Sequence, residues 1–310
     1  METDMKPHSK THKSNVSQKD NKYRFYLVAF LDILGQKDKL LKIKALPQTP
    51  EEFDIFVKLD KETRGMIIKF RDAFFNFFKG VYKKRPIPEE LTADQRTKYL
   101  EIKKRAEKLK PSIIPFTDSI IVYVPLSDDD KVIQVDGIFS SMLAIAGAFL
   151  VLMINGSIFR GGIEIGIACS IGPNEIYGPA LVKAHEIESK KAKYPRIVAG
   201  DELVDFLQKA SLNLEKEVQS EINQVLAQKC LNLLMIDADG KYALDYLGHE
   251  YREMSKQILP DIYEKALSFL ESSFSEIKEK KNSDLFMRYL WLADYFESRL
   301  PLWQKDSKGK

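Results

Sequence analysis

The order of apolar patterns along these 310 residues predicts an α+β fold. One run, residues 26–35, carries a single charge and indicates a buried strand. A second run, residues 113–123, indicates a hairpin. The longer spans between and after these runs have the spacing of apolar residues that is typical of amphipathic helices.

The first strand ends by presenting one carboxylate. Asp32 is the only charged residue in the run, and a strand that is apolar on both faces is usually central in its sheet. A buried carboxylate costs free energy unless it is paired or binds a metal. A helical pattern begins at Gln36, so we expect the backbone N–H groups of Leu34, Gly35 and Gln36 to form a phosphate cradle.

A long amphipathic helix is predicted over residues 51–83. Residues 85–111 indicate a charged helix or linker to which we assign no chemistry. Residues 1–22 are polar and lysine-rich, which predicts a disordered tail without a secretory signal. The apolar stripe of the long helix is expected to face the core and consists of Phe53, Phe56, Ile67, Ile68, Phe70, Phe74, Phe75 and Phe78.

A second isolated carboxylate, Asp118, lies in the turn of the predicted hairpin. Residues 113–116 and 120–124 form its two strands, and Thr117–Ser119 its turn. Asp118 alone is also compatible with an ordinary turn residue or a helix N-cap. Two isolated aspartates at the ends of strands predict a shared Mg²⁺ or Mn²⁺ ion, because these cations prefer carboxylate oxygens.

Residues 137–154 are uncharged, so a membrane span and a buried core helix are both open. Internal glycines and serines and the flanking strand patterns favour the core helix. Residues 157–171 then indicate a strand whose outer face carries Arg160 and Glu164 beside glycines. The glycines suggest close approach of a ligand or a neighbouring chain, and the alternative is an edge strand with a salt bridge between the two charges.

The rest of the chain predicts further helices and one more hairpin. A helix is expected over residues 180–192, a short strand over 195–198, and a helix that Asp201 caps. Residues 231–236 and 242–246 form a hairpin whose acidic turn, 237–240, looks like an ion-binding loop but has the spacing of an ordinary turn. Residues 249–303 are helical. We therefore expect a catalytic domain over 23–247, with a helical insertion at about 47–110, and a helical extension over 248–310.

Composition narrows the class of protein. The chain has 48 basic and 45 acidic residues and a formal charge of +3, which implies no general attraction to nucleic acid. Two cysteines, Cys169 and Cys230, each assigned to a strand, suit a reducing compartment better than a disulfide scaffold. These features predict a cytoplasmic protein that binds neither nucleic acid nor membrane.

Five short fragments, in this order, resemble the class III nucleotide cyclases, and most of all the Pycsar-type pyrimidine nucleotide cyclases of bacterial antiphage defence. The resemblance spans about residues 23–246. The fragments are Phe30-Leu31-Asp32-Ile33-Leu34-Gly35, Phe116-Thr117-Asp118-Ser119, Phe159-Arg160-Gly161-Gly162-Ile163, Tyr177-Gly178-Pro179-Ala180-Leu181 and Ala192-Lys193-Tyr194-Pro195-Arg196-Ile197.

The resemblance implies a ferredoxin-like βαββαβ core that works as a head-to-tail homodimer with its sites at the interface. Asp32, Asp118 and the backbone carbonyl of Ile33 would hold two Mg²⁺ or Mn²⁺ ions, which activate the ribose 3′-hydroxyl and stabilise the leaving pyrophosphate. Arg160 would contact the phosphates from the partner subunit. The implied reaction converts UTP or CTP to the 3′,5′-cyclic monophosphate, a second messenger for antiphage defence.

The same resemblance implies a set of substrate-binding residues. Phe30, Leu34, Gly35, Gln36 and Arg160 would contact the nucleotide. Glu175, Ile176 and Tyr177 stand where the superfamily recognises the base. Where adenylate and guanylate cyclases carry an Asn, an Arg and a purine-selecting residue, this chain has Val182, Glu186 and Ile114, which argues against a standard adenylate cyclase.

Other functions remain open from the sequence. The missing Asn and Arg suggest a catalytically degenerate nucleotide-binding or regulatory module. A dinucleotide cyclase would use the same two-metal chemistry, but no Gly-Gly-acidic-acidic-Phe motif is present. A phosphatase would need an Asp-x-Asp pair, and Leu34 occupies the second position. The sequence does not identify the base, the activating signal, which could be phage-derived, or the role of the C-terminal helices.

Overall fold

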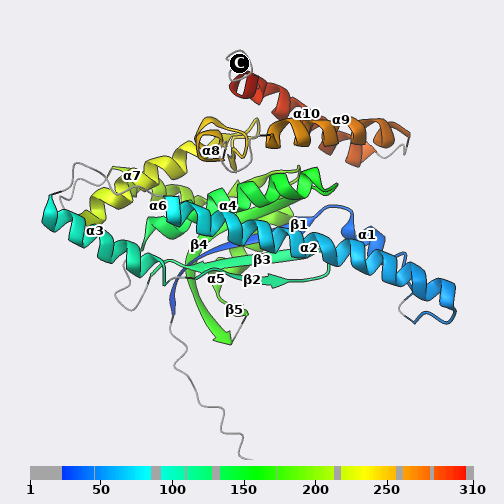
Figure 1. Ribbon diagram of the computed structural model, residues 1–310, viewed down its shortest axis with the longest axis horizontal. Helices are drawn as coiled ribbons and strands as arrows, with labels where there is room; N and C mark the ends of the chain where they lie inside the picture. The colour runs from blue at the N-terminus through cyan, green and yellow to red at the C-terminus, as the bar shows by residue number, and fades with distance from the viewer. Residues whose placement is uncertain are drawn as a thin grey trace, which may run out of the picture.

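The computed structural model describes residues 23–44, 46–84, 92–108, 110–127, 133–172, 174–212, 218–255, 261–279 and 283–304. The tail predicted for residues 1–22 lies outside these ranges, as does the acidic segment 128–130. The described chain is a mixed α+β structure, as predicted (Figure 1).

One mixed sheet runs through the molecule in the order β2-β3-β1-β4-β6-β8-β7, and β5 pairs with β4 alone. β1 is antiparallel to both of its neighbours, β3 and β4, which confirms the prediction that residues 26–35 form a central strand. β4 is parallel to β6, while β8 is antiparallel to β6 and to β7. The strands are β1 Arg24–Ile33, β2 Ser112–Pro115, β3 Ser119–Pro125, β4 Phe159–Gly172, β5 Glu175–Tyr177, β6 Ile197–Ala199, β7 Leu234–Ile236 and β8 Tyr242–Leu244.

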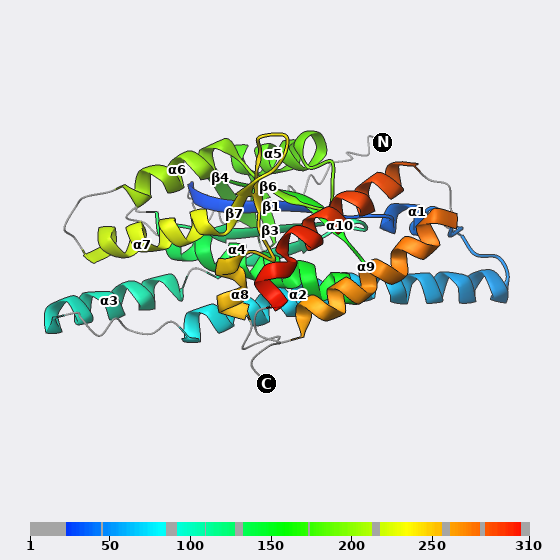
Figure 2. The same ribbon diagram turned by 90° about the horizontal axis from the view of Figure 1, so that it is seen from above.

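Helices cover both faces of β1. Figure 2 shows α5 on one side of β1 and α4 and α2 on the other. Side chains alternate along the strand, so Leu27 and Leu31 pack against α2 and α4 while Tyr26 and Val28 pack against α5. The helices are α1 Gln36–Leu40, α2 Pro50–Lys84, α3 Ala93–Ala106, α4 Val135–Ile154, α5 Pro179–Glu186, the π-helix η1 Ile187–Lys191, α6 Asp201–Ser211, α7 Val218–Asn232, α8 His249–Ser255, α9 Ile262–Glu279 and α10 Ser283–Gln304.

α4 is the core helix that the sequence favoured for the uncharged span. Among the described residues it alone is long and apolar enough to cross a membrane, with a mean hydropathy of 2.3. Its side chains are buried almost throughout, under α2 on one side and the sheet on the other. Gly147 permits the contact with α2, since a Cβ there would lie 2.5 Å from the ring of Phe77.

α2 is core along only part of its length. Phe70, Phe74 and Phe78 are buried against α4 and the sheet, as predicted. Three other members of the predicted stripe are exposed, Phe53 at 56%, Phe56 at 39% and Ile68 at 37%. For Phe53 and Phe56 the reason is geometric, because the N-terminal part of α2 extends past the end of the sheet (Figure 1). Ile68 lies in the middle of α2, where its neighbours Ile67 and Phe70 face the core instead.

Two other local predictions were wrong. Cys230 was assigned to a strand but lies buried in α7. Asp201 was expected to cap α6, but Gly200 is the N-cap and Asp201 is the first helical residue.

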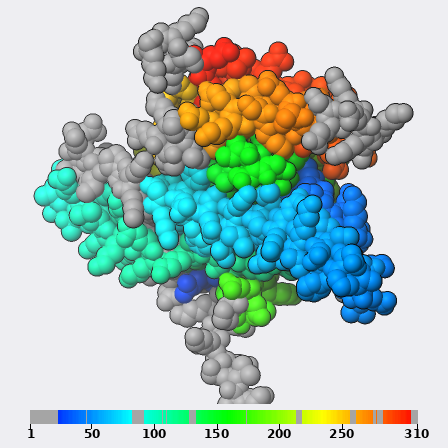
Figure 3. Space-filling view, turned by 45° about the vertical axis from the view of Figure 1, so that its right-hand side comes forward, coloured from blue at the N-terminus to red at the C-terminus, as the bar shows by residue number. Residues whose placement is uncertain are grey.

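The C-terminal helices attach to the domain through α10 and α9. The hydroxyl of Tyr295 donates to Asp245 Oδ1 at 2.8 Å, and Arg299 Nε donates to the same oxygen at 2.9 Å. Trp303 Nε1 donates to the carbonyl of Leu247 at 2.9 Å. α9 lies over α4 (Figure 3). The extension predicted for residues 248–310 is thus docked on the domain by buried polar contacts over its described part.

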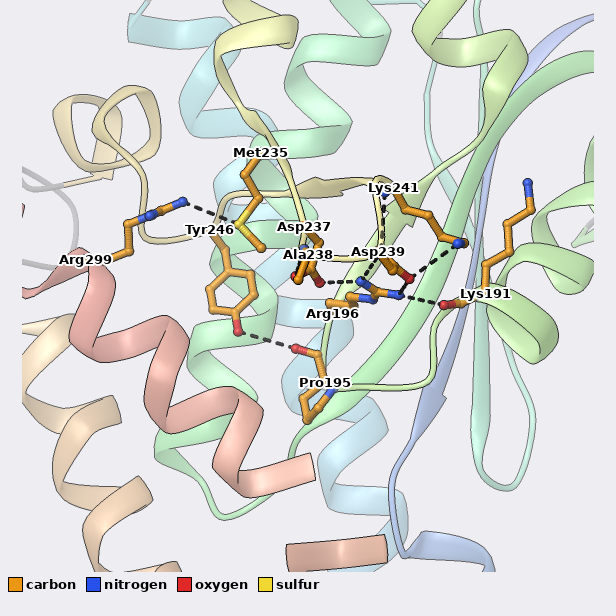
Figure 4. Close-up of polar contacts among 10 residues, drawn as sticks. All are labelled: Lys191, Pro195, Arg196, Met235, Asp237, Ala238, Asp239, Lys241, Tyr246 and Arg299. Carbon is orange, nitrogen blue, oxygen red and sulfur yellow. Dashed lines mark hydrogen bonds and ion pairs between the residues drawn. The ribbon is translucent and has the colours of Figure 1, made fainter. Parts of the chain in front are cut away.

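A buried arginine explains the acidic turn between β7 and β8. The side chain of Arg196, at the start of β6, is 1% exposed. Its guanidinium donates to Asp237, to Asp239 and to the carbonyl of Lys191 at 2.9 Å (Figure 4). The two acids therefore neutralise a buried cation, and Gly240 makes the turn at a φ of +77°.

We expect Arg196→Ala to lower the free energy of unfolding by about 3 kcal/mol, because it leaves the half-buried Asp237 without its counter-charge. Urea denaturation measures the change. Lys241→Ala is the matched control, since this half-exposed lysine also pairs with Asp239 but should contribute less than about 1 kcal/mol. Equal losses in the two variants would contradict the structural role given to Arg196.

Candidate functional site

The three predicted catalytic residues meet at one end of the sheet. In the strand register Asp32 lies opposite Arg160 of β4 on one side and Ser119 of β3 on the other. The N–H of Ile33 donates to the carbonyl of Asp118 at 2.8 Å, which joins the hairpin turn to the end of β1. The β2–β3 hairpin with Asp118 in its turn is confirmed.

Arg160 connects two carboxylates. Its Nε lies 3.2 Å from Asp32 Oδ2 and 3.0 Å from Glu188 Oε1. The first contact is a hydrogen bond, whereas the second is an ion pair without hydrogen-bond alignment, so Glu188 Oε1 is buried without a donor. Within the described residues no hydrogen bond uses the two terminal nitrogens of Arg160, and they remain available to an anionic ligand.

Burial dominates the electrostatics of the two acids beside Arg160. It raises the pKa of Asp32, and the neighbouring guanidinium of Arg160 opposes this by lowering it. The charge of Asp118 raises the pKa of Asp32 further. Burial likewise raises the pKa of Glu188, and Arg160 again lowers it. The site therefore concentrates carboxylates that a further cation would stabilise in their ionised form.

The turn after β1 has the shape expected for the cradle, but not all of its donors are available. Gly35 adopts a φ of +77°, a left-handed conformation that favours glycine, and α1 begins at Gln36. The N–H of Leu34 donates to the carbonyl of Ile158 at 3.0 Å and so does not face a ligand. The side chain of Gln36 is buried, and its amide nitrogen Nε2 donates to the carbonyl of Thr117. Gln36 thus fixes the Asp118 turn against α1.

These residues line a cleft of about 330 Å³. A larger and more open hollow of about 750 Å³ lies between Asn155 and α9, and it shares no lining residue with the cleft that contains Asp32 and Asp118. Of the residues predicted from the sequence, the cleft contains Phe30, Asp32, Ile33, Leu34, Gly35, Asp118 and Arg160. It also contains Lys37, Asp38, Ser119, His185, Glu188 and Arg288, which sequence reasoning did not assign to the site.

Glycines in β4 explain how His185 and Glu188 reach the cleft. A Cβ on Gly162 would lie 2.4 Å from the carbonyl oxygen of Ala184 and 2.8 Å from the N–H nitrogen of Glu188. Close approach of the chain's own helix, rather than of a ligand, therefore requires this glycine. The ring of His185 meets Phe30 edge-on, with centroids 4.8 Å apart. In the sequence, residues 185–191 have the composition of a solvated surface, so no local signal identifies Glu188.

The residues expected to recognise the base are not in this cleft. Glu175, Ile176 and Tyr177 form β5, which pairs with residues 169–172 at the far end of β4. Arg160 is ten residues away along the extended strand, roughly 33 Å. Ile176 is buried beside α5, while Tyr177 is 68% exposed.

The outward position predicted for Glu164 is wrong, because its side chain is buried. The alternative, an edge strand with an Arg160–Glu164 salt bridge, is also wrong, since β4 lies between β1 and β6 and Arg160 pairs with Asp32 and Glu188.

Glu164 is 1% exposed and its Oε1 accepts the N–H of Ile165 at 2.9 Å and that of Leu203 at 2.8 Å. It thereby supplies a side-chain acceptor to the first turn of α6. Burial, followed by a hydrogen bond with Glu202, raises the pKa of Glu164 to about 8. That hydrogen bond and Lys183 lower the pKa of Glu202 to about 2.

This raised pKa makes stability depend on pH. The folded chain keeps a proton on Glu164 that the unfolded chain releases near pH 4.5, so this group's contribution falls as the pH rises from about 4.5 to 8. Glu164→Gln keeps the acceptor and supplies a donor to Glu202. We expect its melting temperature relative to the parent chain to rise between pH 5 and pH 8.

Asp205→Asn is the control, because it removes an exposed carboxylate from α6, the helix that Glu164 contacts. The melting temperature of this variant relative to the parent chain should not rise between pH 5 and pH 8. A difference between Glu164→Gln and the parent chain that is constant with pH would contradict the protonated state assigned to Glu164.

The donor set suits a hard divalent cation. Asp32 and Asp118 both line the cleft and provide carboxylate oxygens, together with Ile33. Within the described residues no group of three or more His, Cys, Asp or Glu side chains is arranged to hold a metal. Two carboxylates are compatible with Mg²⁺ or Mn²⁺, because these ions keep water and phosphate oxygens as their remaining ligands.

Comparison with known proteins gives one structural likeness to report. No protein-family model matches the chain, and no curated protein matches it by sequence. Among solved structures, the adenylyl cyclase CyaB from P. aeruginosa is similar over 61% of this chain and 82% of that chain, at 16% identity and a TM-score of 0.34. A TM-score this low does not equate the two folds.

Proposed function

We propose that this chain is a nucleotide cyclase that converts UTP or CTP to the 3′,5′-cyclic monophosphate and pyrophosphate. The observation that carries the proposal is the strand register, which brings Asp32 opposite Arg160 and next to the Asp118 turn. Two carboxylates for divalent cations and one arginine for phosphate are the groups that phosphoryl transfer of this type needs.

The fold supports the proposal. Among the first elements, strands β2, β3, β1 and β4 lie in that spatial order and are antiparallel to their neighbours. α2 connects β1 towards the hairpin, α4 connects the hairpin to β4, and both cover one face. We take this arrangement as the ferredoxin-like βαββαβ core that the sequence resemblance implies.

Each residue has a defined task in the proposed reaction. Asp32, Asp118 and the carbonyl of Ile33 would hold two Mg²⁺ or Mn²⁺ ions, which lower the pKa of the ribose 3′-hydroxyl and neutralise the departing pyrophosphate. Arg160 would donate its terminal nitrogens to phosphate oxygens. The resemblance suggested that Arg160 contacts the phosphates bound by the partner subunit. Because Arg160 lies in the same cleft as Asp32, we propose instead that it contacts the phosphates bound in its own subunit.

We further propose the head-to-tail homodimer. β5 pairs only with β4, so the end of β4 and β5 project beyond the sheet (Figure 1). Ile167, Ile171 and Tyr177 are exposed there, at 49%, 52% and 68%. In a dimer of this kind the exposed Glu175 and Tyr177 would contact the base in the partner's cleft, which accounts for their distance from Arg160. Ile176 is buried against α5 and would support them from below rather than touch the base.

The pyrimidine preference rests on substituted positions. Val182 and Glu186 stand where purine cyclases carry an Asn and an Arg, and neither can make the hydrogen bonds of those side chains. Val182 is apolar and 65% exposed on α5, and Glu186 is acidic and pairs with Lys190. Ile114 on β2 is half-buried and apolar. A role in antiphage defence, a cytoplasmic location and a phage-derived activator follow from the same resemblance and belong to this proposal.

One observation favours a second function, a nucleotide-binding module without turnover. Arg160 already forms an ion pair with Asp32, so a metal ion would have to compete with the guanidinium for this carboxylate. Such a module would bind nucleotide and release no cyclic product.

The deciding experiment is to incubate purified protein with each of the four common ribonucleoside triphosphates and Mn²⁺ and to identify products by mass spectrometry. A cyclic pyrimidine monophosphate supports the cyclase. Binding of a triphosphate without any cyclic product supports the module. A product with two nucleobases would replace both with a dinucleotide cyclase.

We expect Asp32→Asn and Asp118→Asn each to reduce turnover more than about a hundredfold, or ~2.7 kcal/mol, because each removes a carboxylate that holds the ions. Both variants should remain folded by circular dichroism. Asp72→Asn, an exposed change on α2, is the control and should keep full activity. Full turnover in either site variant would rule out the assignment.

A further inference from the structure

We propose that Arg288, on the C-terminal helix α10, is a triphosphate-binding residue of the cleft, so that the C-terminal helices complete the site. This inference rests on the proposed function and gives a role to a segment that the sequence left without one. Arg288 lines the same cleft as Asp32, Asp118 and Arg160, although 128 positions separate it from Arg160 along the chain.

The guanidinium of Arg288 is not used elsewhere in the described structure. No hydrogen bond or ion pair within the described residues holds it, whereas Arg160 contacts both Asp32 and Glu188. The charge of Arg288 nevertheless acts on the site. Burial and Arg160 have larger effects on the pKa of Asp32, and Arg288 lowers it in addition. Of the two arginines in the cleft, Arg288 therefore has fewer contacts with other described side chains and is more available to a ligand.

The docking of α10 holds Arg288 towards the cleft. Arg288, Trp291 and Tyr295 are spaced three and four residues apart and so share one face of the helix. The ring of Trp291 stacks on Tyr194 at 6.0 Å and on Tyr295 at 5.5 Å between centroids. The hydroxyl of Tyr295 also accepts the N–H of Leu247 at 2.8 Å. These contacts fix the helix one and two turns away from Arg288.

The arrangement of the helices agrees with this register. Figure 2 shows α10 crossing over the sheet, with its N-terminal end directed towards the side where α1 lies. Lys37 and Asp38 of α1 line the cleft together with Arg288. The cleft therefore has a wall from the first turn after β1 and a wall from the C-terminal extension.

The charges in the cleft indicate what Arg288 would bind. The carboxylates of Asp32, Asp38, Asp118 and Glu188 line it, and its permanent cations are those of Lys37, Arg160 and Arg288. Divalent ions at Asp32 and Asp118 would neutralise these carboxylates. The cleft would then carry an excess of positive charge, which favours binding of a highly charged anion. An arginine suits phosphate because its planar guanidinium donates two parallel hydrogen bonds. A triphosphate carries three phosphate groups, so Arg160 and Arg288, which line the same cleft, can each bind a different one.

Calorimetry with inorganic tripolyphosphate in Mg²⁺ buffer tests the inference without relying on turnover. We expect Arg288→Gln to weaken tripolyphosphate binding about tenfold or more, and Arg288→Lys to recover part of the loss. Arg71→Gln removes an exposed arginine of α2 and is the matched control, which should bind as the parent chain does. Turnover of UTP, measured in parallel, should show a higher KM in Arg288→Gln.

The outcomes separate this inference from the proposed function. If the parent chain binds neither tripolyphosphate nor any nucleoside triphosphate, the proposed function fails. If the parent chain binds tripolyphosphate and Arg288→Gln binds it equally well, the role of Arg288 is overturned while the cyclase proposal stands. If Arg288→Gln melts early, Arg288→Lys decides, because unchanged affinity in that variant excludes paired hydrogen bonds from this side chain.

Discussion

The pairing of β1 with β4 is the constraint on which the site depends. It places Asp32 opposite Arg160. Shifting the register by one residue would turn every side chain of β1 to the other face, so the apolar pattern that buries Leu27 and Leu31 also fixes the position of Asp32. The core and the site are therefore specified by the same alternation of side chains.

Glycine makes the second layer of the site possible. Because Gly162 has no side chain, the end of α5 and the π-helix approach β4 closely enough to bring Glu188 beside Arg160. A single turn of π-helix often marks a functional position in a helix. The ion pairs of Arg160 with Asp32 and Glu188 then hold the guanidinium by one nitrogen, in a setting where burial makes each charge matter more.

Local patterns predicted most of the sheet core but only part of the site. The central strand, the hairpin with Asp118, the buried helix α4 and the strand that carries Arg160 all follow from short-range alternation and helical spacing. The exposure of Phe53 could not be predicted, since it depends on where the sheet ends. Glu188 and Arg288 were not found because only tertiary packing brings a charged surface sequence or a distant helix into the cleft. The pattern also paired Glu164 with Arg160, whereas burial beside α6 gives it a separate role.

The buried helix α4 has a consequence for how the chain reaches this fold. Its mean hydropathy of 2.3 makes water a poor solvent for it, and a lipid bilayer a good one. Most of the surfaces that cover it, from α2, β1 and β3, precede it in the chain. During synthesis these elements emerge before α4, so an apolar surface is present to receive it. The order of the elements thus favours collapse onto the sheet over aggregation or capture by a membrane.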